Sequence, residues 1–169
     1  MSGVFDNSFA GTDIVAGIDV PVIKGNTITF AHYIFGELQT ISYSIHRPAA
    51  PVRALGFSGP KGFTRGSRLI AGSLVFTVFD RHIVYRILEQ YQKAFPSRVF
   101  TDEMPPFHVT VVFNNEYGVR SALRIYGICV VDEGQVMSVN DMYTEQTMTY
   151  VARDMVPMHP DLLFKAGAC

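Results

Sequence analysis

A two-residue alternation of apolar and polar side chains constrains the fold of this chain more than any other feature. In residues 38–46, Ile41, Tyr43 and Ile45 alternate with small hydroxyl residues. A period of two places these two sets on opposite faces of a strand, so the segment predicts a half-buried β-strand. Comparable segments rich in β-branched and aromatic residues predict further strands at 27–34, 68–79, 107–113, 122–131, 136–139 and 147–155.

Two of these segments carry the strongest core signals. In residues 68–79 the apolar face is formed by Ile70, Leu74, Phe76 and Val78. Residues 122–131 become apolar on both faces, which is typical of a strand in the middle of a sheet. We expect turns at 114–118, where Gly118 is available, and at 132–134 (Asp-Glu-Gly).

Only residues 81–95 show the periodicity of a helix. Their apolar residues fall on one stripe at helical spacing, Asp80 precedes them as an N-cap, and Pro96 ends the segment. About seven or eight strands and one helix predict a mainly-β fold, a β-sandwich or barrel with one flanking α-helix. At 169 residues the chain is long enough for a single domain, 1–169.

Three segments lack a sustained period. Residues 1–17 are expected to form an N-terminal arm, 156–169 a C-terminal tail, and 47–67 a long loop with three prolines, four glycines and no acidic residue. A loop of about 20 residues exceeds the usual length in compact domains and is commonly functional.

The composition indicates a chain that is covered by partner subunits. Hydrophobic residues make up 48% and charged residues 17%, and the mean hydropathy is +0.18. Soluble domains usually carry roughly 25% charged residues. The surplus of apolar side chains therefore favours oligomerisation.

Several classes of partner are disfavoured by the same numbers. A net charge of −1 argues against a large basic face for nucleic acid. No apolar run approaches the ~20 residues that span a bilayer, and the N-terminus lacks the basic region of a signal peptide. We expect Cys129 to be a buried reduced thiol, and Cys169 could crosslink neighbouring subunits.

The glycine-rich segment 56–67 invites a phosphate-binding interpretation. A P-loop, however, places its lysine after the glycine and leads into a helix, whereas Lys61 precedes Gly62 and the segment leads into a predicted strand. The remaining alternatives are a flexible basic surface loop and a loop that reaches a neighbouring subunit, where its cations meet acidic groups. We favour the second, and the candidate subunit-interface residues are Arg53, Lys61, Gly62, Arg65 and Arg68.

No pattern points to catalysis, a cofactor or a metal, so the chain is not expected to be an enzyme. The histidines show no ligand spacing; they are His32, His46, His82, His108 and His159. His82 is explained as a residue in the first turn of the predicted helix. The acidic pairs Asp102–Glu103 and Asp132–Glu133 fall in a predicted loop and a predicted turn, where carboxylates are usually solvated.

Three segments resemble the tail tube and tube-like baseplate proteins of contractile-tailed bacteriophages. They are I-x-G-S-L-x-F at 70–76, R-I-Y-G at 124–127 and T-E-x-T-x-x-Y-x-A-R-D at 144–154. The order of segments around them extends the resemblance over roughly residues 25–157. It implies a β-barrel-like protomer with one flanking helix.

The resemblance also implies a mode of assembly. Six protomers would form a ring, their sheets would join into a continuous inner barrel, and stacked rings would form a tube through which DNA passes without specific binding. A long loop contacts the adjacent ring in that family, and residues 47–67 match it by position. Lumens in that family tend to be acidic, whereas this chain is nearly neutral.

The sequence therefore predicts a virion structural protein, a tail tube subunit that is assembled in the host cytoplasm and contacts sheath and baseplate proteins. The alternative within this class is a ring protein of the baseplate or tail terminus. From another class, the alternative is a monomeric small-ligand-binding or hydrolytic β-barrel. A mass near that of one chain at high concentration would favour the monomer.

Overall fold

The computed structural model describes residues 9–24, 27–78, 87–89, 100–114, 120–139 and 144–159. In this part of the chain, β-strands dominate and helix is scarce. The strands are β1 (Ile14–Lys24), β2 (Thr27–Ile34), β3 (Leu38–His46), β4 (Ala49–Val52), β5 (Gly62–Arg65), β6 (Leu69–Thr77), β7 (Phe107–Asn114), β8 (Arg120–Val136) and β9 (Glu145–His159). Two short 3₁₀ helices, η1 (Gly11–Asp13) and η2 (Thr101–Glu103), precede β1 and β7.

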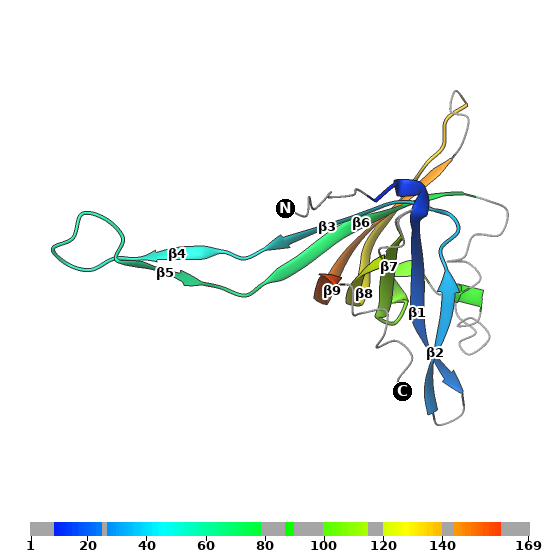
Figure 1. Cartoon of the computed structure of the whole chain (residues 1–169), viewed down its shortest axis with the longest axis horizontal. Coiled ribbons are helices and arrows are strands. Elements are labelled where there is room, and N and C mark those ends of the chain that lie inside the picture. The colour runs from blue at the N-terminus through cyan, green and yellow to red at the C-terminus, as the bar shows by residue number, and fades with distance from the viewer. Residues whose placement is uncertain are drawn as a thin grey trace, which may run out of the picture.

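Seven strands form one antiparallel sheet in the order β2-β1-β7-β8-β9-β6-β3 (Figure 1). β8 is its middle strand, which confirms the central strand predicted at 122–131. β2 and β3 are its edge strands, and their bounds agree with the predicted segments. β4 and β5 form a separate two-stranded sheet.

The large sheet curls so that its two ends approach each other. A hollow of about 270 Å³ is lined both by Ile14 and Ala16 of β1 and by Leu38 and Ile41 of β3. The backbone N–H of Phe35 donates to the carbonyl of Ala16 at 2.8 Å, and the ring of Phe35 packs on that of Phe76 at 5.2 Å. This curvature encloses the core as in a barrel.

The strand register explains the composition of the core. Ile18 lies opposite Val109, and Val109 lies opposite Ile125, so all three side chains point to the inner face, where each is at most 1% exposed. Of the predicted inward positions, Ile70, Leu74 and Phe76 are confirmed, since they belong to the same buried cluster, whereas Val78 is only half-buried.

The predicted helix at 81–95 is described only in part. Residues 87–89 are helical, and Ile87 and Leu88 are buried in the core cluster. The predicted N-cap Asp80, His82 and Pro96 lie outside the described residues.

Three sequence predictions are wrong. Residues 132–134 do not form a turn, because β8 continues to Val136 and absorbs a register shift between Val130 and Asp132 instead. Residues 137–139 are therefore not part of a new strand. Residues 47–67 are not an irregular loop, since β4 and β5 pair within them.

The predicted terminal segments are shorter than expected. β1 begins at Ile14, inside the segment 1–17 assigned to an arm, and residues 1–8 lie outside the described part. β9 extends to His159, into the segment 156–169 assigned to a tail, of which 160–169 lie outside the described part.

Tyr150 connects β9 to β3 across the intervening strand β6. Its hydroxyl donates a hydrogen bond to the carbonyl of Ser42 at 2.9 Å. The ring lies over Gly72, where an added Cβ would stand 2.8 Å from Tyr150 Cζ, so only glycine leaves room for it. Burial, with a smaller contribution from Tyr43, raises the pKa of Tyr150 from 10.0 to about 12.

This shift predicts a loss of stability at alkaline pH. Between pH 10 and 12 the unfolded chain releases the Tyr150 proton while the folded chain keeps it, so the free energy of unfolding falls as the pH rises. We expect the full loss to be about 2–3 kcal/mol relative to Tyr150→Phe, which cannot titrate. Urea denaturation of both proteins from pH 8 to 12 measures the difference; parallel pH profiles would contradict it.

Candidate functional site

Residues 47–68, here called the arm, project from the sheet between β3 and β6 (Figure 1). The main sheet ends at the pair His46 and Leu69, and the arm's own pairing begins at Ala49 and Arg65. At the base, the Gly66 N–H donates to the carbonyl of Pro48 at 2.8 Å. Arg47 Nε donates to the carbonyl of Gly66 at 2.8 Å. The arm is thus an ordered, hydrogen-bonded hairpin that extends the β3–β6 pair away from the sheet.

The structure places all five predicted interface residues on the arm, but not at one point. Arg53 follows β4 and Lys61 precedes β5 at the outer end of the hairpin, where the Lys61 N–H donates to the carbonyl of Val52 at 2.9 Å. Gly62 pairs with Val52 and is half-buried. Arg65 lies at the inner end of the hairpin, and Arg68 at the junction with β6.

The arm concentrates positive charge. It holds five of the 14 cationic residues of the chain and none of the 15 acidic ones, so its formal charge is +5 while the rest of the chain carries −6. The near-neutral total conceals this division. Two parts of opposite sign on one chain favour contact between the arm of one copy and the body of another.

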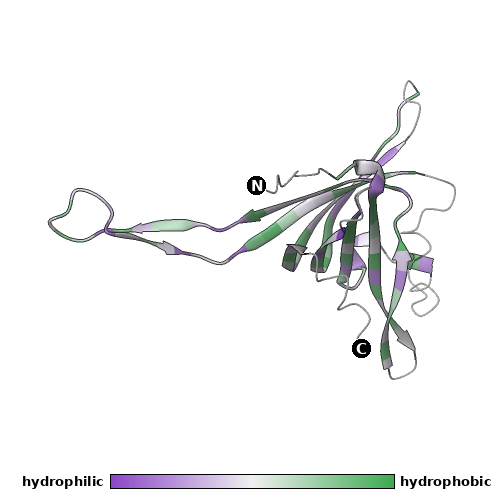
Figure 2. Cartoon of the chain, in the orientation of Figure 1, coloured by the Kyte–Doolittle hydropathy of each residue, from purple (hydrophilic) through white to green (hydrophobic). Residues whose placement is uncertain are grey.

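The arm also exposes large apolar side chains, which proteins usually bury. Leu55, Phe57 and Phe63 are 102%, 63% and 69% exposed, and Figure 2 shows apolar residues along β4. Lys61 Nζ lies 5.0 Å from the ring centre of Phe57. A two-stranded hairpin is at best marginally stable alone in water, so the arm is suited to a partner that covers these side chains.

Both edges of the large sheet are apolar as well. On β2, Ile28, Phe30 and Ile34 are 67%, 58% and 61% exposed, and on β3, Tyr43 and Ile45 are about half exposed. In the described sheet each of these strands pairs on one side only. Proteins normally protect such edges with charges, proline or a covering element. Sequence reasoning missed both edges, because a strand's pattern does not reveal its place in the sheet order.

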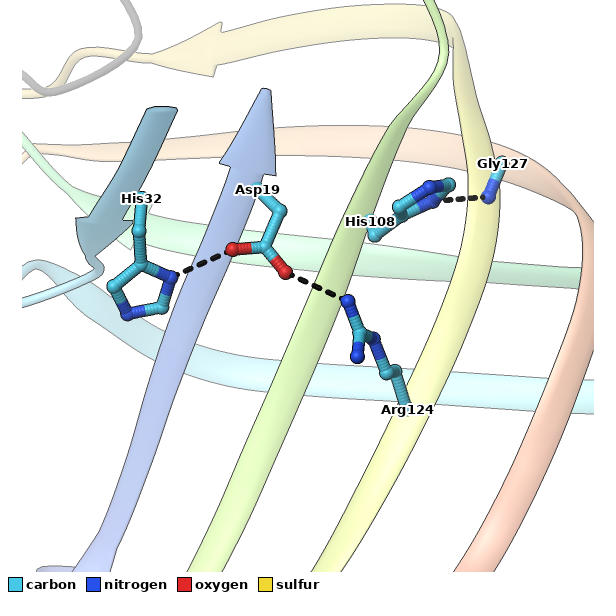
Figure 3. A network of polar contacts seen from close by, with 5 residues as sticks. All are labelled: Asp19, His32, His108, Arg124 and Gly127. Atoms are coloured by element: carbon cyan, nitrogen blue, oxygen red, sulfur yellow. Dashed lines mark hydrogen bonds and ion pairs between the residues drawn. The ribbon is translucent and has the colours of Figure 1, made fainter. Parts of the chain in front are cut away.

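A polar network crosses the outer face of the sheet (Figure 3). Asp19 of β1 pairs through Oδ1 with His32 Nδ1 of β2 at 2.7 Å. Its Oδ2 accepts from Arg124 Nη2 of β8 at 3.0 Å, across the intervening strand β7. The Asp19 and Arg124 side chains are only 18% and 28% exposed. One half-buried carboxylate therefore ties three strands together.

A second polar contact beside this network fixes a histidine. Gly127, at φ +61°, donates its N–H to His108 Nδ1 at 3.0 Å, which places the ring proton of neutral His108 on Nε2 (Figure 3). The His108 ring stacks on Phe30 at 5.5 Å and meets Tyr126 edge-on at 5.4 Å. His32 and His108 thus serve the packing of the outer face.

Few side chains in the described part are arranged as a catalytic or metal-binding site would require. None of its clusters of His, Cys, Asp or Glu could hold a metal ion. Cys129 is free as predicted but half-buried, not fully buried, and Cys169 lies outside the described residues. Among the residues described, no helix is long and apolar enough to cross a membrane.

Comparison with solved structures finds the same fold in several tail proteins. The tube terminating cap of the anti-feeding prophage superposes with a TM-score of 0.60 at 10% identity, over 94% of this chain and 99% of that one. The fold is that of tail tube proteins. The sheath/tube terminator of the PVC extracellular contractile injection system gives 0.62 at 9% identity, over 91% and 98% of the two chains. The SPP1 tail tube gives 0.56 at 12% identity, over 90% and 79%.

No protein-family model and no curated protein matches the sequence. At identities near 10% the structural likeness establishes the tail-tube fold alone. It confirms the resemblance that the strand segments carried.

The outer-face network predicts a coupled loss of stability. Asp19→Asn leaves the half-buried Arg124 without its anion and should cost about 1–2 kcal/mol of unfolding free energy. Combining it with Arg124→Met should cost less than the sum of the two single changes by about 1 kcal/mol. Urea denaturation measures this cycle, with the exposed Asp154→Asn as a control; strictly additive costs would contradict the coupling.

Proposed function

We propose that the chain is a structural subunit of a tail, and specifically the subunit of a tail tube built from stacked hexameric rings. The observation that supports this most is the arm, a charged and apolar hairpin held away from the body of a tail-tube fold. A protein that works alone has no use for such a surface. An assembling subunit needs it.

Ring formation would use the edges of the large sheet. β2 and β3 are different surfaces of one chain, so pairing β2 of one copy with β3 of the next is a head-to-tail contact that closes when the rotation completes a circle. Such pairing would cover the exposed Ile28, Phe30, Tyr43 and Ile45. It would join the sheets into one continuous barrel.

Stacking of rings would use the arm. Its +5 charge and its exposed phenylalanines suit a neighbour with negative charge and apolar surface, and the rest of the chain carries −6. With the cations gathered on arms that neighbouring copies cover, the remaining surface of a tube would be acidic on balance. DNA would then pass through the lumen without binding.

The alternative in this class is a single ring at the baseplate or at the end of the tail. The solved structures include a terminating cap and a tube terminator with TM-scores of 0.60 and 0.62, and a sheath–tube complex with 0.60. Copy number separates the two: a tube subunit is present as many rings in each particle, and a terminal protein as one. In either role the protein would reside in the particle tail, contact sheath or baseplate proteins, and require no cofactor or enzymatic activity.

Replacing the arm's strands tests the function. A chain in which Asn-Gly replaces residues 49–65 should keep its core, because the substitution joins Pro48 to Gly66, which are already hydrogen-bonded. We expect this variant to match the unmodified chain in circular dichroism. It should form no tubes in electron micrographs.

The matched control keeps the arm's charge and length through Arg53→Lys and Arg65→Lys, and should form tubes as the unmodified chain does. Tubes of normal length from the chain without β4 and β5 would contradict the proposal. So would an unmodified chain that remains a monomer of about 18.8 kDa at high concentration in sedimentation.

A further inference from the structure

A recess lies between η2 and β8. It has a volume of about 370 Å³, and its lining includes Phe100, Asp102, Val131, Asp132 and Glu133. Sequence reasoning assigned Asp102 and Asp132 to a loop and a turn, where their carboxylates would be solvated separately. The fold brings them together because η2 packs against β8.

The lining of the recess complements the arm in two respects. Among the described residues, its lining contains three carboxylates, Asp102, Asp132 and Glu133, and no cationic side chain. It also contains Phe100 and Val131, which are 63% and 60% exposed. Anionic groups beside bare apolar surface are the counterpart of a hairpin that presents arginines, a lysine and phenylalanines.

A buried amide is hydrogen-bonded to one of the carboxylates that line the recess. Gln146 is 1% exposed, and its Nε2 donates to Glu133 Oε1. Its Oε1 accepts no hydrogen bond from the described residues. The hydrogen bond from this buried amide holds the Glu133 carboxylate in the lining of the recess.

The recess and the arm lie at opposite ends of the strands that connect them. The arm begins where His46 pairs with Leu69, at the start of β6. Thr77, at the end of β6, pairs with Glu145, which pairs with Val136 at the end of β8 that carries Asp132 and Glu133. Two complementary surfaces at opposite ends of these strands allow a head-to-tail contact, which repeats without closing when the rotation between copies does not complete a circle.

We propose that this recess receives the arm of a second copy of the chain. The outer arm cations Arg53 and Lys61 would meet the carboxylates of Asp102 and Asp132, and Phe57 or Phe63 would cover Phe100. This assignment rests on the proposed function and adds the surface on which stacking depends.

The test uses a recess variant with Asp102→Lys and Asp132→Lys, both exposed residues. We expect it to unfold at the same urea concentration as the unmodified chain but to need at least a tenfold higher protein concentration to assemble beyond a single ring. The matched control, Asp13→Lys with Asp154→Lys, reverses two exposed carboxylates outside the recess and should assemble normally.

Mixing variants isolates the contact. The recess variant keeps its arm, and the chain with Asn-Gly in place of residues 49–65 keeps its recess, so one arm–recess contact can form between them but cannot repeat. We expect the mixture to give complexes of two layers in sedimentation and electron micrographs, while neither variant does so alone.

Two results would overturn the assignment: normal assembly of the recess variant, or a mixture that sediments as its separate components. If the recess variant assembles but the chain without β4 and β5 does not, the arm is required and only its receiving surface is wrong. If the chain without β4 and β5 also assembles, the proposed stacking function fails as well.

Discussion

The pairing of β3 with β6 is the interaction on which both the core and the arm depend. Inside the body, Tyr150 locks this pair to β9 by spanning Gly72 and donating to the carbonyl of Ser42. Beyond His46 and Leu69 the two segments of the chain leave the sheet and pair again as β4 and β5. The arm is therefore held in direction by the buried end of the hairpin that carries it, although its own strands are short and exposed.

Cations, carboxylates and exposed apolar side chains gather on separate surfaces of the molecule, a distribution that suits a protein covered by other copies. The arm carries cations and exposed aromatic rings, and the recess at the opposite end carries carboxylates and exposed apolar residues. Between them, the edge strands present isoleucines and a phenylalanine to solvent. Association between copies would cover all three surfaces of a chain in which only 17% of the residues are charged.

The sequence alone predicted those strands in which apolar and polar residues alternate without interruption. The segments 27–34 and 38–46 became β2 and β3 with the same bounds, and Leu74 is buried as its position in the alternation required. β1 was missed because Gly17, Asp19 and Pro21 interrupt its apolar pattern. Two of these residues are explained by tertiary contacts. Gly17 leaves room for the His32 ring, and Asp19 binds Arg124, which lies 105 residues away in the sequence.

The functional surfaces were harder to predict for the same reason. Glycines and prolines in 47–67 indicated a loop, since propensity does not reveal that Ala49 and Arg65 are brought together by the strands behind them. The turn expected at 132–134 failed because pairing with β9 outweighs the local preference of Asp-Glu-Gly. The cations of the arm were recognised from sequence, whereas the recess required the packing of η2 on β8 and had no signal in the chain.

Hydrogen exchange measured on dilute monomer and on assembled protein tests most directly whether copies of the chain cover one another. We expect backbone amides of residues 49–65 and of β2 and β3 to exchange rapidly in the monomer and to become protected on assembly, while those of β8 are protected in both. Arm amides that exchange equally fast in both states would contradict it.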